Sequence, residues 1–226
     1  MKAVVVVGIA ILVRVGSLSP TPSLAMQAAS SETEKAAPDR VISIPRGQPV
    51  VVDGKISPKE WDDSARLEIT VKPDWKIPVR FKHDDRNLYF LFDRVTNGGD
   101  RLFPELFFDP YDRKGSYWEK GRWWFHVSAN LCESEGAPNV YEKNGVFQCA
   151  HEKPGWEANN PPTTETETIE IRIAFDKIGR KPSQGMRMGV AAAMTNATGN
   201  NRQVWYVWPM KATVDSPRTW GEAVLQ

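Results

Sequence analysis

From Val41 to the end of the chain, apolar and polar residues alternate in short runs of period two. Clusters of glycine, proline, asparagine and aspartate separate these runs, a pattern typical of all-β proteins. The stretch "IPVRFKHDDRNLYFLFD" predicts a β-hairpin whose second arm places Leu88, Phe90 and Phe92 on one side, because aspartate and asparagine suit its turn. Further strands are expected at 105–108, 122–129, 145–150, 167–175, 186–195 and 203–208.

Helical signals are scarce in the same region. In "SPKEWDDS", Ser57 is a candidate N-cap, Pro58 occupies the first helical position and Glu60 completes a capping box, which predicts one or two helical turns. A second short turn is expected at "DKIG". The proline- and asparagine-rich run between Cys149 and Thr166 predicts a surface loop. The predicted fold class is therefore all-β, a single β-sandwich of antiparallel strands.

Residues 1–25 have the composition of a secretory signal peptide. Lys2 precedes an apolar stretch, and Ser23 and Ala25 supply the small residues of a cleavage site. The apolar stretch is shorter than the roughly 20 residues that span a bilayer, and Arg14 interrupts it. We therefore expect a secreted protein, extracellular or periplasmic, with no membrane span after the signal peptide is removed.

The remaining chain divides into a short lead-in and one domain. Residues 26–39 are small and polar without an apolar period, which predicts a disordered lead-in. Residues 40–226 are enough for one sandwich with a sizeable core. The net charge is +1, with basic and acidic residues interspersed, so the sequence offers no basic patch for nucleic acid or an anionic membrane.

The two cysteines, Cys132 and Cys149, are expected to form a disulfide, because an oxidising compartment favours a bridge over free thiols. The alternative is a metal site built from these cysteines with His126 and His151. That set lacks the C-x-x-C spacing of strong zinc motifs. We expect the disulfide and no metal.

The stretch "GRWWFHVSAN" contains two adjacent tryptophans. Successive side chains of a strand point to opposite faces, so Trp123, Phe125 and Val127 are assigned to the core. Trp124 and His126 then share the outer face with Ser128 and Asn130. The neighbouring stretch "ELFFD" divides in the same way, with Glu105, Phe107 and Asp109 on its outer face.

A face that combines aromatic rings with carboxylate, imidazole and hydroxyl groups suits a carbohydrate. Sugar rings present C–H groups to an aromatic plate and hydroxyl groups at their rim, so a stacked ring anchors the sugar and polar neighbours orient it. The alternative is that a loop covers Trp124 and that His126 is an ordinary surface residue.

Five stretches resemble, in order, the landmarks of family 9 carbohydrate-binding modules and related DOMON-like domains. They are "VVDGKISPKEWDDS", "VRFKHDDRNLYFLF", "PELFFDP", "TIEIRIAFDKIG" and "VWYVWPMKATVDSPRTWGEAVL". Together they extend from Val50 to Leu225. The resemblance implies an immunoglobulin- or jelly-roll-like sandwich that is secreted, lacks catalytic machinery and binds a sugar. A glycan-degrading enzyme or an envelope component is the expected protein partner.

The resemblance also locates the expected site. The two tryptophans that clamp the sugar in the family fall near Gly99 and Val214, an arginine falls at His126, and the family's acidic contact is kept as Glu105. The aromatic platform must therefore come from elsewhere, and parity does not distinguish Trp205 from Trp208. The candidate ligand-binding residues are Glu105, Phe107, Trp118, Trp124, His126 and Trp208.

Three other functions have less support in the sequence. An enzyme is not expected, since G-x-S-x-G, H-E-x-x-H and phosphate-binding glycine loops are missing. Haem binding has its raw material in Met186, Met188, Met194, Met210, His83, Lys82 and Lys211. Met186, Met188 and Met194 share a strand face with Val190 and Ala192, which indicates core packing, so no cofactor is expected. A protein-binding surface module is the third alternative, because exposed aromatic residues also serve protein interfaces.

Overall fold

The computed structural model describes residues 40–115, 118–128, 131–136, 140–143, 146–149, 154–159, 167–197 and 203–226; within 140–143 and 146–149 it describes the backbone alone. The predicted signal peptide and lead-in lie outside these ranges. Within them, no helix has the length and hydrophobicity needed to span a lipid bilayer.

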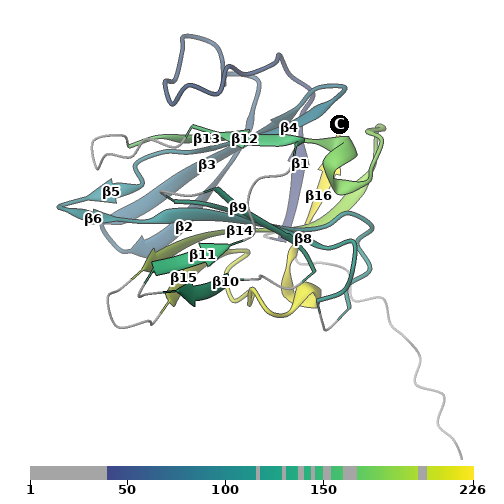
Figure 1. Ribbon diagram of the computed structural model, residues 1–226. Coiled ribbons are helices and arrows are strands. Elements are labelled where there is room, and N and C mark those ends of the chain that lie inside the picture. The colour runs from purple at the N-terminus through teal and green to yellow at the C-terminus, as the bar shows by residue number, and fades with distance from the viewer. Residues whose placement is uncertain are drawn as a thin grey trace, which may run out of the picture. The chain divides into compact units, whose positions relative to one another are not determined.

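Two β-sheets pack against each other as a sandwich, with β13 and β4 in the upper layer of Figure 1 and β14 and β9 below. The larger sheet has seven strands, in the order β1 (Val41–Ile44), β16 (Gly221–Leu225), β14 (Arg187–Ala197), β7 (Phe103–Asp109), β8 (Trp123–Val127) and β9 (Leu131–Glu135), with β15 (Gln203–Trp208) also paired to β14. The smaller sheet has five strands, in the order β12 (Trp156–Ala158), β13 (Ile169–Ala174), β4 (Asn87–Phe92), β3 (Trp75–His83) and β2 (Ala65–Lys72).

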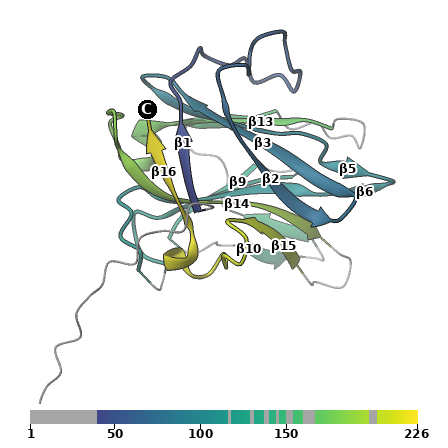
Figure 2. The same ribbon diagram turned by 180° about the vertical axis from the view of Figure 1, so that it is seen from behind.

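Strand pairing within both sheets is antiparallel except at one edge. There β1 runs parallel to β16, as Figure 2 shows from behind. Two small ribbons complete the strands: β5 (Thr96–Asn97) with β6 (Asp100–Arg101), and β10 (Val140–Lys143) with β11 (Val146–Cys149). The helical elements among the described residues are the short 3₁₀ helices η2 (Phe175–Ile178) and η3 (Pro217–Thr219). The predicted all-β sandwich is confirmed.

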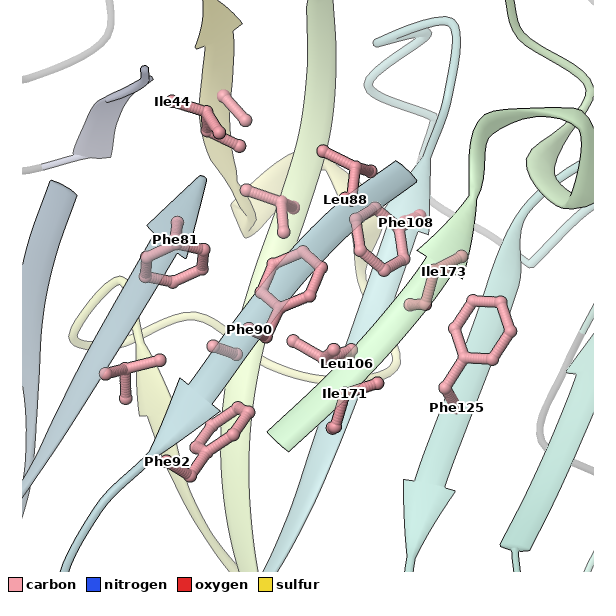
Figure 3. Packing of buried hydrophobic residues seen from close by; sticks show 14 of the residues in the cluster. Ile44, Phe81, Leu88, Phe90, Phe92, Leu106, Phe108, Phe125, Ile171 and Ile173 are labelled. Atoms are coloured by element: carbon pink, nitrogen blue, oxygen red, sulfur yellow. The ribbon is translucent and has the colours of Figure 1, made fainter. Parts of the chain in front are cut away.

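The main hydrophobic core fills the space between the two sheets (Figure 3). Phe90 of β4 lies at its centre, with ring centroids 5.2 Å from Phe81 and 5.7 Å from Phe108, both edge to face. Such pairs add to the area that the rings bury. Leu88 and Phe92 are fully buried beside Phe90, so the predicted hairpin and its inward face are confirmed.

The expected helical turns at 57–64 are instead a series of tight turns. The amide of Glu60 donates to the carbonyl of Ser57 at 3.1 Å, and the amide of Ser64 donates to that of Trp61 at 3.3 Å. Lys59 has a φ of 68°, a left-handed conformation that a right-handed helix cannot include. Of the two reciprocal bonds of a capping box, the structure shows the one in which the amide of Ser57 donates to the Glu60 carboxylate.

The expected loop between Cys149 and Thr166 contains a strand, β12, which the sequence pattern did not predict. Trp156 at its start is 8% exposed and its ring lies edge to face with Phe125, 5.2 Å between centroids. Burial of this indole overrides the local preference of its proline- and asparagine-rich neighbours, since packing outweighs weak propensities in a strand.

A buried ionic cluster closes one end of the larger sheet. Asp109 and Arg122 are both almost fully buried and pair at 3.1 Å, and Arg113 contacts the same carboxylate at 3.3 Å. Asp112 lies beside this pair with its side chain 16% exposed. Burial raises the pKa of Asp112 to about 6, against the opposing charge of Lys114 and with help from Glu222.

This raised pKa predicts a pH-dependent difference between the wild type and Asp112→Asn. The folded state holds the proton of Asp112 more tightly than the unfolded state, so the wild type loses stability as pH rises from about 4 to about 6. Asparagine does not titrate and tolerates the φ of 49° found here. The variant should be roughly 2–3 kcal/mol more stable at pH 8, with the difference lost at pH 4. Urea unfolding of both proteins between pH 4 and pH 8 tests this prediction. A difference in unfolding free energy that stays constant with pH would contradict it.

Candidate functional site

Glu105 on β7 is a buried carboxylate surrounded by aromatic donors. It pairs across the strands with His126 of β8 and with Ala193 of β14. Its Oε2 accepts hydrogen bonds from the indole N–H groups of Trp124, at 3.2 Å, and Trp205, at 3.0 Å, and its Oε1 lies 3.0 Å from Nδ1 of His126. A carboxylate that is 3% exposed needs such donors, because an unpaired buried charge is strongly unfavourable.

The strand faces agree with the predicted alternation, but the outer face is not open to solvent. Phe125 and Val127 belong to the main core and Trp123 packs on it half-buried, whereas Trp124 belongs to a second cluster. Trp124 is 3% exposed and Phe107 1%. The predictions that Trp124 and Phe107 form an exposed platform are therefore wrong, and Glu105 is likewise buried.

The cover over this face comes largely from the chain that follows β15. Val214 and Trp220 pack on Phe107, with the Trp220 ring 5.7 Å from that of Phe107. Trp118 adds a third ring, 5.3 Å from Trp220 and 6.0 Å from Phe107. Its indole nitrogen is buried and has no hydrogen-bond partner among the described residues. Trp118 is thus partly buried against the second cluster, and its predicted role in ligand binding stays a prediction.

Trp208 also differs from its predicted role. It pairs with Ala192 of β14, a residue of the main core, and its ring lies 6.5 Å from that of Phe81. A Cβ atom at Gly221 would come within 2.8 Å of the Trp208 ring, so the indole fills the space that this glycine leaves. Trp208 therefore faces the inside of the sandwich, away from Glu105.

Trp205 is the tryptophan that β15 places on the Glu105 side. It is 37% exposed, and its indole N–H is held by Glu105 while part of its ring remains accessible. His126 is partly exposed beside it. The half-buried ring of Phe103 on β7 lies 6.2 Å from that of His126. Sequence reasoning left Trp205 unresolved and missed Phe103, although its outward parity with Glu105 and Phe107 could have indicated it.

The polar groups beneath these rings have some of their hydrogen-bonding capacity left. Oε2 of Glu105 receives two indole donors, whereas Oε1 receives His126 alone among the described residues. This oxygen therefore has capacity for one further donor. Thr195 is paired with both Phe103 and Trp205 across the sheet, and its buried hydroxyl oxygen has no hydrogen-bond partner within the described part of the chain. The candidate site therefore consists of Trp205, His126 and Phe103 over Glu105 and Thr195.

The positions expected for the family's clamping tryptophans supply no ring to this site. Gly99 lies in the turn between β5 and β6 with a φ of 94° and open space around it. Val214 is 7% exposed within the second cluster. The aromatic rings of the candidate site are therefore those around Glu105.

Several of the residues considered for haem are engaged in packing or ion pairs. Met188 and Met194 are fully buried in the main core, as their strand parity predicted. Lys82 is buried with its Nζ 2.9 Å from Asp63. His151 lies outside the described residues. Among those residues, no three histidine, cysteine or acidic side chains are grouped to hold a metal ion.

Of the two cysteines of the predicted disulfide, the structure describes the side chain of Cys132 alone. Cys132 pairs with His126 across β8 and β9 and is 7% exposed. It is not a free thiol, and none occurs among the described residues. Cys149 is described by its backbone alone, in β11. The Cys132–Cys149 bridge therefore stays a prediction.

Comparison with known proteins identifies the fold. No family model and no curated protein matches the sequence. Among solved structures, the chain is similar to a family 9 carbohydrate-binding module from Caldicellulosiruptor kristjanssonii in complex with cellotriose, with a TM-score of 0.57 and 19% identity over 82% of this chain and 93% of that one. The same module in complex with glucose matches with a TM-score of 0.57 and 19% identity over 82% of this chain and 95% of that one. The chain therefore has the fold of a family 9 carbohydrate-binding module.

Proposed function

We propose that this chain is a non-catalytic, secreted carbohydrate-binding module whose ligand stacks on Trp205. The observation that carries the proposal is an indole that is 37% exposed yet fixed in orientation by a hydrogen bond from its N–H to the buried Glu105. A fixed, solvent-facing aromatic plate binds a sugar ring without first losing rotational freedom. The two similar structures, bound to cellotriose and to glucose, support a saccharide as the ligand.

The residues around Trp205 can orient the sugar. A hydroxyl of a stacked sugar can donate to the remaining lone pair of Glu105 Oε1, provided that it reaches beneath the rings. His126 offers its second ring nitrogen, since only Nδ1 is engaged by Glu105. Phe103, which lies in the same row across the sheet as Thr195 and Trp205, extends the apolar surface beside His126. One ring for stacking and a few polar groups at its edge is the usual composition of a site for a hydroxylated ligand.

The chemistry of the site favours binding over catalysis. Glycoside hydrolysis needs two carboxyl groups across a cleft. The candidate site is built on one carboxylate, Glu105, and three donors already bind it. Export is supported by the signal-like composition of residues 1–25. A glycan-degrading enzyme or an envelope component remains the proposed protein partner.

Trp205→Ala should abolish most of the sugar binding. Covering roughly 80 Å² of one indole face at about 25 cal/mol per Å² is worth about 2 kcal/mol, which corresponds to a roughly thirtyfold weaker Kd. Titration calorimetry with cellotriose, and affinity electrophoresis in a panel of soluble polysaccharides, measure the change.

Trp123→Ala is the matched control, because Trp123 is a half-buried indole on the opposite face of β8. It should leave the Kd unchanged for protein that remains folded. Equal losses in both variants would contradict a platform at Trp205. A wild-type protein that binds no polysaccharide but captures a protein would favour the interface alternative.

A further inference from the structure

A polar groove lies on the outer face of the smaller sheet. It is a cavity of about 700 Å³ between the chain that follows β1 and the turn joining β3 to β4, lined by Arg46, Gly47, Gln48, Pro49, Asp84, Asp85, Arg86, Asn87, Tyr89 and Arg172. Tyr89 packs with the cluster outside this sheet, not with the main core. The groove is thus separate from the Glu105 site, which belongs to the other sheet.

The acidic groups of this groove are already satisfied by the protein. The Asp84 carboxylate accepts the backbone amides of Arg86 and Asn87 and the hydroxyl of Tyr89, each at 2.6 Å. Burial alone would raise the pKa of Asp84, but these hydrogen bonds hold it below its usual value. Asp85 pairs with Arg46. Both carboxylates therefore have partners of their own, and they compete little with an anionic ligand for the remaining donors of the groove.

The donors of the groove exceed its free acceptors. Arg86 is exposed, and its guanidinium has no partner within the described part of the chain; the same holds for the side chain of Gln48. Arg172 is tied by one nitrogen to Glu157 at 3.0 Å, which holds the guanidinium in place and leaves its other N–H groups available. The unpaired guanidinium of Arg86, together with the remaining N–H groups of Arg172, suits a ligand that carries a carboxylate.

We propose that this groove binds an acidic saccharide, with its carboxylate held by Arg86 and Arg172 and its hydroxyl groups near Gln48 and Asn87. The volume of about 700 Å³ lies in the range of cavities that hold organic ligands and exceeds what a lone inorganic anion fills. Pro49 is the one aliphatic side chain in the lining, so a hydroxylated ligand fits better than an apolar one. The choice of a saccharide skeleton rests on the proposed function, whereas the carboxylate is argued from the groove alone.

The test compares trigalacturonate with cellotriose by titration calorimetry and by chemical-shift changes at low ionic strength. Arg86→Ala should weaken trigalacturonate binding roughly ten- to hundredfold, as expected for loss of a charge-assisted hydrogen bond, and Arg172→Ala should act in the same direction. Binding should also weaken as salt is raised to 150 mM, about the physiological level. Arg66→Ala removes an exposed arginine of the same sheet outside the groove and should leave the Kd unchanged.

The two sites can fail separately. Trp205→Ala should weaken cellotriose binding and spare trigalacturonate, with the reverse pattern for Arg86→Ala. The acidic-saccharide proposal is overturned if the wild type does not bind trigalacturonate, if both arginine variants bind it like the wild type, or if inorganic phosphate binds as tightly as the sugar. Loss of cellotriose binding alone would count against the Trp205 site and not against the groove.

Discussion

Replacing Trp124 by alanine should lower the free energy of unfolding by about 3–5 kcal/mol, the usual cost of deleting a buried tryptophan. Trp124 is 3% exposed and packs in the second cluster with Phe107 and Trp220. Its ring stacks on His126 with 5.7 Å between centroids, and its N–H donates to Glu105. The substitution therefore opens a cavity and removes one of the donors that neutralise a buried carboxylate. Urea unfolding followed by fluorescence and circular dichroism measures the loss.

Trp205→Ala is the informative comparison, because the two indoles donate to the same carboxylate oxygen. Trp205 is partly exposed, so its removal should cost about 2 kcal/mol, close to the value of one hydrogen bond to a charged group. The two variants thus separate packing from ligand contact, because Trp124→Ala should mainly lower stability and Trp205→Ala should mainly weaken sugar binding. Near-wild-type stability of Trp124→Ala would mean that this indole is open to solvent after all.

The difference between Trp123 and Trp124 shows what a strand pattern can predict. Alternation correctly assigned the two rings to opposite faces of β8, because the period of a strand is a local property of the backbone. It did not reveal that Val214 and Trp220, some 90 residues later in the chain, cover the outer face. Which medium a face meets depends on long-range packing, so the parity was right and the predicted exposure of Trp124 was wrong.

The choice between Trp205 and Trp208 was limited in the same way. Both tryptophans lie in one six-residue strand, but they differ in parity, and only the register between β15 and β14 decides which of them meets Glu105. The hydrogen bond from Trp205 to Glu105 joins residues 100 positions apart. No local signal encodes such a register, whereas the β3–β4 hairpin, with its turn contained in four residues, was predicted correctly.

Glu170→Ala should destabilise the protein by roughly 3 kcal/mol or more, because one buried carboxylate serves three donors. Oε1 accepts the indole N–H of Trp61 at 3.0 Å, and Oε2 accepts the backbone amides of Gly54 at 2.9 Å and Asp53 at 3.1 Å. Glu170 is fully buried, and burial raises its pKa despite these hydrogen bonds. Alanine would leave the buried indole N–H of Trp61 and the two backbone amides without their acceptor.

This contact explains why the stretch "VVDGKISPKEWDDS" folds without a helix or strand of its own. Trp61 and Val50 pack on Tyr89 and Leu91 outside the smaller sheet, and Glu170 of β13 fixes both the turn at Gly54 and the indole of Trp61. The Glu170→Ala variant should therefore lose amide-exchange protection around residues 53–61 before the sheets unfold.

Glu68→Ala provides the control for that experiment, since Glu68 lies on the same sheet in an exposed pair with Lys76 and should cost at most about 1 kcal/mol. Glu170→Gln keeps one acceptor oxygen but turns an amide N–H₂ toward the remaining donors, so its stability should fall between the wild type and the alanine variant. If Glu170→Ala unfolds at the same denaturant concentration as Glu68→Ala, the carboxylate does not hold this segment, and apolar packing of Trp61 alone must do so.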